Sequence, residues 1–123
     1  MSKKKTIQTE KALQESERKF RNLAEKSVVG IYVIQDDVFK YVNAKLAETL
    51  GYRPEELMGK IGPDKVVHPE DWPVVRDNIH SRVLGKIESV HYEFRGIRKN
   101  GQLYYAEVYG SATIYEGKPA VIG

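Results

Sequence analysis

Residues 41–59 read YVNAKLAETLGYRPEELMG, and this stretch decides the fold. Its first residues end a strand, and Asn43 is of the type that caps a helix by accepting a hydrogen bond from the first turn. The helix is predicted over 44–50, because Gly51 is suited to ending it. Pro54 then favours the first turn of one further short helix. The stretch therefore predicts a strand followed by two short helices.

A β-hairpin is predicted immediately before this stretch. Residues 30–35 and 38–42 are short runs rich in β-branched and aromatic residues, and Asp36 and Asp37 separate them. Two such runs joined by two turn-forming residues are typical of a hairpin.

An amphipathic helix is predicted at the N-terminal side. At 100° per residue, Leu13, Phe20 and Leu23 fall on one stripe of it. We assign residues 11–27 to this flanking helix and residues 1–10, which include three consecutive lysines, to a disordered basic tail. The stripe either packs on its own domain or pairs with a second copy, and the sequence leaves both open.

The C-terminal half is predicted to hold one longer helix and three strands. Residues 68–71 read HPED, which suits a helix start because proline fits the first turn and carboxylates complement its free N–H groups. The helix follows over 72–84. Strands are predicted over 90–98, 102–114 and 119–123, and we expect the last to be truncated.

Runs of strands therefore flank a helical middle. This order predicts an α+β fold with an antiparallel sheet, formed by one domain over 28–123.

Five pieces of the sequence, taken in order, resemble the PAS sensor domain (PAS/S-box family) of bacterial or archaeal signalling proteins. Each piece is weak alone, and their shared order and spacing make the resemblance specific. They span nearly the whole chain: Glu17–Leu23 as the flanking helix, Gly30–Asp36 as the first strand, Tyr41–Ala44 with Leu50–Gly59, His68–Asp71 as the start of the long helix, and Phe94-Arg95 with Arg98–Gly101 as a strand and hairpin.

The resemblance implies a PAS-like fold in which helices cover one face of a five-stranded antiparallel sheet. It also implies a ligand or cofactor between the two layers and dimerisation through the flanking helix. Members of the family are usually input modules of histidine kinases, cyclic-di-nucleotide enzymes or transcription regulators. We therefore predict a cytoplasmic sensory module of a two-component system. It would bind a small ligand or a partner and act on an effector domain of the same chain, a histidine kinase or a diguanylate cyclase.

The candidate site residues are apolar side chains of the strands and of the two longer helices. The choice of strand residues depends on which face of the sheet each residue occupies. A shift of one residue along a strand moves its side chains to the other face. The cavity candidates are Ile31, Val33, Trp72, Val75, Ile79, Ala106 and Val108, and the dimer candidates are Leu13, Phe20 and Leu23. Tyr105 and Tyr109 are expected on the outer face, either as a docking surface or beneath the flanking helix.

Composition excludes several classes of function. The 123 residues make one domain, and no apolar run approaches the roughly 20 residues that span a bilayer. No cysteine is present, which excludes disulfides, thiolate metal sites and cysteine nucleophiles. Residues 1–26 hold eight Lys/Arg and four Asp/Glu, a net charge of +4 that leaves −1 for the remainder of the total of +3. A nucleic-acid partner is therefore not predicted, because the folded body lacks a basic excess.

Neither a metal site nor a catalytic site is predicted. His68, His80 and His91 lie on different elements and lack the i, i+4 spacing of a helical ligand pair. The acidic pairs suit turns and helix starts, and no nucleophile elbow, phosphate loop or zinc-protease helix occurs, so this segment is not expected to be an enzyme. We expect no covalently bound cofactor. A haem held by His80, a non-covalent flavin in a redox or gas sensor, and a non-sensing dimerisation scaffold stay open as alternatives.

Overall fold

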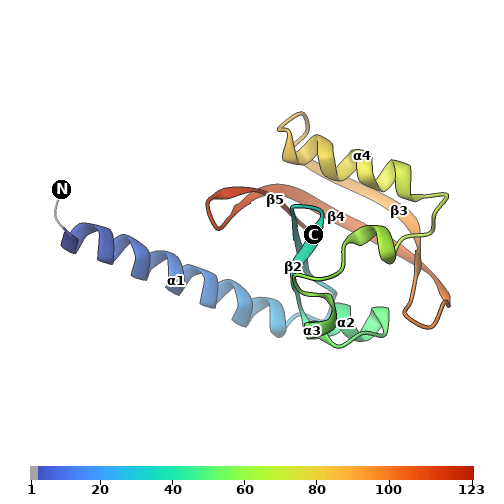
Figure 1. Ribbon diagram of the computed structural model, residues 1–123, viewed down its shortest axis with the longest axis horizontal. Coiled ribbons are helices and arrows are strands. Elements are labelled where there is room, and N and C mark those ends of the chain that lie inside the picture. Colours follow the sequence, from blue (N-terminus) through green and yellow to red (C-terminus); the bar gives the residue numbers. More distant parts are fainter. Residues whose placement is uncertain (1–2) are drawn as a thin grey trace.

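The structure is a computed structural model that describes residues 3–123, with side chains from residue 8 onward. Residues 1–2, part of the predicted tail, lie outside it. Helices and strands follow one another in the order α1 (Lys3–Glu25), β1 (Tyr32–Gln35), β2 (Val38–Val42), α2 (Ala44–Leu50), α3 (Pro54–Leu57), the 3₁₀ helix η1 (Pro63–Lys65), α4 (Trp72–Val83), β3 (Ser89–Ile97), β4 (Leu103–Tyr115) and β5 (Lys118–Ile122). Figure 1 shows these elements in their spatial arrangement.

The five strands form one antiparallel sheet in the order β2-β1-β5-β4-β3. β3 and β4 pair from Ser89 opposite Ser111 to Ile97 opposite Leu103, and α4 runs alongside them (Figure 1). The predicted α+β class and the antiparallel sheet are confirmed.

Local chemistry explains where several elements begin and end. The side chain of Asn43 accepts a hydrogen bond from Leu46 N at 3.0 Å, and α2 ends at Gly51 with φ of 82°. Asp36 and Asp37 both have positive φ, as the two central residues of a tight hairpin turn require. The hairpin and the helix over 44–50 are thus formed as predicted.

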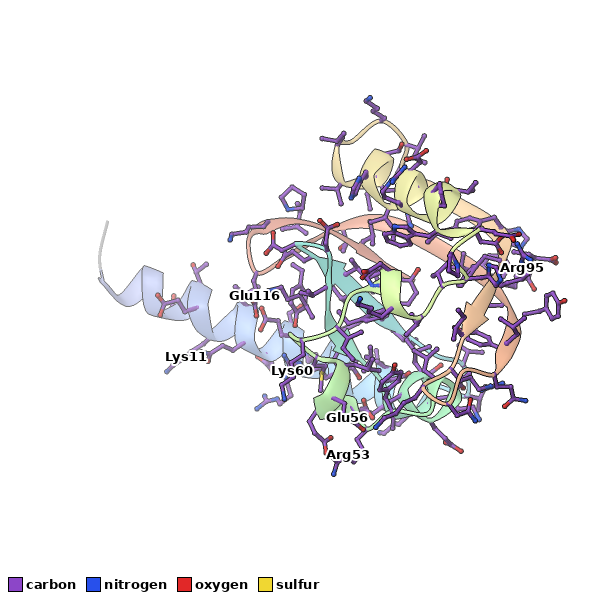
Figure 2. The ribbon with its side chains drawn as sticks, turned by 45° about the vertical axis from the view of Figure 1, so that its right-hand side comes forward. Lys11, Arg53, Glu56, Lys60, Arg95 and Glu116 are labelled. Atoms are coloured by element: carbon purple, nitrogen blue, oxygen red, sulfur yellow. The ribbon has the colours of Figure 1, made fainter. Side chains whose placement is uncertain are left out.

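α1 begins at Lys3, well before the start predicted at Lys11. No glycine or proline interrupts residues 3–25, so nothing in the sequence stops the helix from extending through the expected tail. Its first half stands clear of the domain, and Lys11 is exposed there (Figures 1 and 2). In the part of the chain that the structure describes, no helix is both long and apolar enough to cross a membrane.

Two clusters of buried side chains lie on opposite faces of the sheet. The larger one packs the sheet against α2, α3, η1 and α4, and includes Ile34, Leu50 and Ile79. The smaller one packs the other face of β1 and β2 against the last turns of α1, and includes Val33 and Ala24. β1 is therefore covered on both faces.

Candidate functional site

A cavity of about 60 Å³ lies inside the larger cluster. Its wall is almost wholly apolar, and it comes from the inner face of the sheet on one side and from α2, η1 and α4 on the other. The lining residues are Tyr32, Ile34, Phe39, Leu46, Leu50, Pro63, Val66, Val67, Val75, Ile79, Tyr92, Phe94 and Tyr104. A mostly apolar hollow with a few polar groups is the usual form of a small-molecule site.

Three tyrosines, Tyr32, Tyr92 and Tyr104, contribute to this wall. Burial raises the pKa of Tyr92 and of Tyr104 to about 12, and burial also raises the pKa of Tyr32. All three hydroxyls are therefore protonated at neutral pH and can donate a hydrogen bond to a ligand.

Glycines make the close packing around the cavity possible. A methyl group on Gly96 would collide with the ring of Tyr104, its partner across β3 and β4. A methyl group on Gly110 would collide with Nη1 of Arg82, a residue of α4 that is 1% exposed. The glycines thus create the space in which these two large side chains lie.

A four-way hydrogen-bonded junction attaches α1 to the domain. The side chain of Asn43 is fully buried and donates to Ala24 O at 2.8 Å and to Val29 O at 2.9 Å. The same side chain accepts from Ile31 N at 2.9 Å and from Leu46 N at 3.0 Å. One amide therefore joins the last turn of α1, the entry to β1 and the start of α2.

Side chains of α1 add further contacts on the outer face. The rings of Phe20 and Tyr41 meet edge to face at a centroid distance of 5.5 Å. The hydroxyl of Tyr41 donates to Glu25 Oε1 at 2.6 Å, and Arg21 Nη2 donates to the hydroxyl of Tyr115 at 3.4 Å. The C-terminal half of α1 is thus packed on the sheet.

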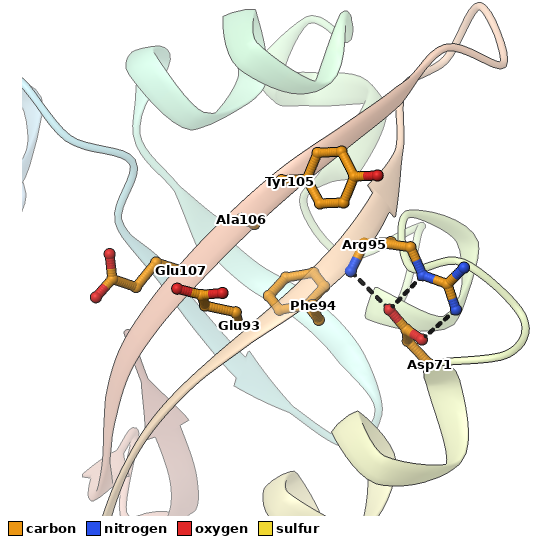
Figure 3. A pocket seen from close by; sticks show the side chains of 7 residues that line it. All are labelled: Asp71, Glu93, Phe94, Arg95, Tyr105, Ala106 and Glu107. Atoms are coloured by element: carbon orange, nitrogen blue, oxygen red, sulfur yellow. Dashed lines mark hydrogen bonds and ion pairs between the residues drawn. The ribbon is translucent and has the colours of Figure 1, made fainter.

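A second, more polar hollow lies by β3, β4 and the start of α4 (Figure 3). Arg95 donates to both carboxylate oxygens of Asp71, from Nη2 to Oδ1 at 2.6 Å and from Nε to Oδ2 at 3.1 Å, and its backbone N–H also reaches Oδ2 at 2.7 Å. These hydrogen bonds lower the pKa of Asp71 to about 2. Because these charges are already paired, we interpret the group as a fastening of α4 to β3.

The predicted cavity residues fall into three sets. Val75 and Ile79 lie in the cavity wall, and Trp72 packs against the larger cluster without lining the cavity. Ala106 and Val108 lie on the inner face, opposite Phe94 and Tyr92, but line an adjoining open groove.

Ile31 and Val33 are not in the cavity, so the parity predicted for β1 is wrong by one residue. Val33 packs in the smaller cluster with α1, and Ile31 packs against that cluster and also lines the open groove with Ala106 and Val108. Tyr32 and Ile34 line the cavity instead. Both faces of β1 are covered, so alternation along this strand could not indicate which face holds the cavity.

The predicted dimer residues also differ in their environment. Phe20 packs on Tyr41 of the same chain, whereas Leu13 and Leu23 are 55% and 73% exposed. Tyr105 and Tyr109 remain exposed on the outer face, because α1 covers Tyr115 rather than them.

The sequence does not predict the buried position of Arg82 or the tyrosines of the wall. Arg82 follows Val75 and Ile79 at i+7 and i+3, the spacing of one helix face, and this spacing was the signal that could have placed it inside. The sequence pattern indicates packing or interface roles for its tyrosines and gives no signal that Tyr32 and Tyr92 line a cavity.

The cavity alone is small, about 60 Å³ against the roughly 300–1,000 Å³ of pockets for drug-sized ligands and cofactors. It adjoins the open groove of about 480 Å³, which shares Tyr32, Leu46, Phe94 and Tyr104 with it. None of the three histidines lines it: His80 contacts Asp37, His91 contacts Glu107, and His68 accepts from Glu70 N. Among the described residues, no three His, Asp or Glu side chains gather as a metal site requires.

Comparison with known proteins places these features in context. The family model described as the PAS fold matches residues 39–123. The chain is 27% identical over 117 residues to the "Methyl sulfide methyltransferase-associated sensor" of Methanosarcina acetivorans. The aligned region covers 94% of this chain and 11% of the relative. It is 30% identical over 97 residues to the "Probable diguanylate cyclase DgcE" of Escherichia coli. The aligned region covers 78% of this chain and 9% of the relative. The chain thus spans about a tenth of these curated relatives.

Two solved structures have a similar fold. One is the PAS domain of an HTR-like protein from Haloarcula marismortui, with a TM-score of 0.70, 23% identity and 94% coverage of each chain. The other is a PAS domain from a two-component sensor histidine kinase, with a TM-score of 0.67, 18% identity and coverage of 89% of this chain and 94% of the other.

Proposed function

Because this chain belongs to the PAS fold family, we propose that it is a sensory input module whose interior cavity binds a small molecule. The observation that carries the proposal is the cavity itself, whose wall is formed by apolar side chains of the sheet and of α4 together with Tyr32, Tyr92 and Tyr104. The volume of about 60 Å³ limits the ligand to a few non-hydrogen atoms.

The two faces of β1 supply the path from the cavity to α1. Ile34 lines the cavity, and the neighbouring Val33 packs in the cluster that holds Ala24 of α1. A ligand that shifts β1 therefore also changes the packing beneath α1. It can do so only if it binds the two arrangements with different affinity, and a coupling of about 1–3 kcal/mol is typical of such switches.

The effector in this proposal is a domain of the same polypeptide, in the first place a histidine kinase and otherwise a diguanylate cyclase. The similar PAS domain from a sensor histidine kinase and the relative named as a diguanylate cyclase support this choice. Both effectors use nucleotide substrates of the cytoplasm, and we place the module in the same compartment.

Dimerisation through α1 is the remaining part of the proposal. Leu13 and Leu23 are exposed apolar side chains on the helix, and Leu13 also lines a groove between α1 and the sheet. We expect Leu13→Glu to lower the molecular mass measured by light scattering from dimer to monomer. A mass that is unchanged by the substitution would contradict this part only.

Thermal unfolding with a panel of small molecules tests the sensory role. We expect two- to four-carbon alcohols, ketones and acids to include compounds that raise Tm, because a ligand that binds only the folded state stabilises it. Ile79→Trp should fill the cavity and abolish the response in a folded protein.

Val74→Trp is the matched control, because Val74 is on the same helix but 60% exposed. It should leave the response intact. If Ile79→Trp folds and its response equals that of the original chain, the cavity is not the binding site. If no compound raises the Tm of the original chain, the non-sensing scaffold becomes the better explanation.

A further inference from the structure

One edge of β4 is only partly paired. From Leu103 to Ser111 the strand pairs with β3 on one side, whereas β5 covers its other side only from Ser111 to Tyr115. Over 103–110 no strand lies against this second edge in the part of the chain that the structure describes. An unpaired edge presents backbone N–H and C=O groups to which another strand can bind.

The backbone hydrogen bonds identify the groups on this open edge. Arg95 O accepts from His68 N at 2.9 Å, so the backbone of Arg95 points away from β4. Tyr105 lies opposite Arg95, and in an antiparallel pair the two members of such a position both point outward. The direction alternates along the strand, so Glu107 and Tyr109 point the same way as Tyr105. The N–H and C=O groups of these three residues therefore face the open edge.

The adjoining open groove of about 480 Å³ runs along this edge. Its opposite wall includes residues 29–32 at the entry to β1, and Gly123 also lines it. Gly123 N donates to Tyr32 O at 3.1 Å and Gly123 O accepts from Tyr32 N at 2.8 Å, so the chain is still paired with β1 where it reaches the groove. Because β5 lies between β1 and β4, the gap beyond Gly123 has the width of one strand. We call this gap the slot.

We propose that the slot binds a β-strand of the same polypeptide that continues β5 directly from Gly123. The proposal rests on the proposed function, in which an effector domain belongs to the same polypeptide. A second copy or a separate protein would have to place a strand end to end with Gly123, whereas the continuing chain enters the slot without a loop to close. The truncated last strand expected from the sequence agrees with this occupant.

The register of β5 determines what the added strand would contact. Because Ser111 lies opposite Ile122, the second residue after Gly123 falls opposite Val108, on the inner face. The third falls opposite Glu107, on the exposed outer face. We therefore expect apolar residues at the second, fourth and sixth positions and polar residues between them, with a basic residue favoured beside Glu107.

Such a strand would also close the cavity on one side. The groove and the cavity share four lining residues, Tyr32, Leu46, Phe94 and Tyr104. Inward side chains of the strand would therefore lie against residues that a ligand in the cavity contacts. The strand then supplies a route from the cavity to a C-terminal effector, in addition to the route through β1 to α1.

Hydrogen exchange measured by NMR tests the slot on two forms of the chain. One form ends at Gly123, and the other carries eight added residues that alternate threonine and valine. In the shorter form we expect the amides of Tyr105, Glu107 and Tyr109 to exchange about a hundredfold faster than those of Ala106 and Val108, which are directed towards β3. In the longer form all five amides should be protected, and Tm should rise by about 4 °C or more. An extension by the natural residues after Gly123 should have the same effect.

The matched control carries proline at the third and fifth added positions. Since Gly123 is bonded to β1, the N–H groups of these two positions would face β4. Proline has no N–H and does not fit a central strand, so this form should behave like the chain that ends at Gly123.

Three outcomes would overturn the proposal. Fast exchange at Tyr105, Glu107 and Tyr109 in the threonine–valine form would show that the slot does not accept a strand. Protection of these amides in the shorter form would show that the slot is already filled. Protection by the threonine–valine extension but not by the natural one would show that the occupant is another chain. These measurements need no ligand, so the small-molecule panel tests the sensory function separately.

Discussion

Replacing Gly110 by alanine tests the position of the buried guanidinium independently of any ligand. The added methyl group would lie on Nη1 of Arg82. That nitrogen cannot move alone, because the guanidinium is planar and its Nε is bonded to Asn78 O. The side chain is also 1% exposed, so it has no free path to solvent. The whole buried group must therefore shift to accept the methyl group.

Two opposing contributions set the expected change in stability. Adding a methyl group to a filled interior costs about 1–3 kcal/mol. Alanine in place of glycine within a strand returns about 0.5–1 kcal/mol of backbone entropy. We therefore expect Gly110→Ala to lower the free energy of unfolding by about 1–2 kcal/mol. In an Arg82→Met background the shorter, flexible side chain gives way, so the same change should be neutral or slightly stabilising.

Urea unfolding of the two single variants, the double variant and the original chain measures the coupling. We expect a coupling free energy of about 1–3 kcal/mol between positions 110 and 82. Gly96→Ala is the matched control, because its methyl group meets the ring of Tyr104 rather than Arg82. It should destabilise both backgrounds equally. A cost of Gly110→Ala that is the same with and without Arg82 would refute the placement of the guanidinium.

Three further predictions concern the core, the attachment of α1 by Asn43 and the dependence of stability on pH below about pH 4. Ile79→Ala should cost about 2–5 kcal/mol in urea unfolding, whereas Val74→Ala on the exposed side of α4 should stay within about 0.5 kcal/mol. Asn43→Ala removes a helix cap and leaves buried backbone groups unpaired, so it should cost more than about 2 kcal/mol; a smaller loss would contradict the role of the junction. Arg95 holds the pKa of Asp71 at about 2 against an ordinary value of 3.8, so this pair adds stability above about pH 4 that is lost as the pH falls towards 2. The decline in Tm across that window should be smaller in Asp71→Asn, and an unchanged decline would argue against the pair.

Local signals made much of the fold predictable. Asn43 and Gly51 each need only their own neighbours to begin and end α2, and two residues with positive φ suffice for the β1–β2 turn. The order of these signals also made the family resemblance visible. Such features depend on short-range chemistry, so one sequence carries them.

The composition of the cavity wall depended on contacts that are distant in sequence. β1 has α1 on one face and the cavity on the other, so its burial pattern does not distinguish Val33 from Ile34. Arg82 reads as a surface residue until Gly110, which lies 28 positions later, is known to leave room for it. The buried position of Arg82 becomes evident only from the assembled layers.

The attachment of α1 has a consequence for chimeric sensors built from this domain. A fusion joined at residue 28 would remove Ala24 and Phe20 and leave the amide of Asn43 without one of its acceptors. The exposed turn over 8–12 is a better junction, because it precedes Leu13, where the groove between α1 and the sheet begins. Each residue inserted there rotates everything upstream by about 100° while the anchored turns stay in place. A series of such insertions would therefore vary the angular phase between sensor and output one step at a time.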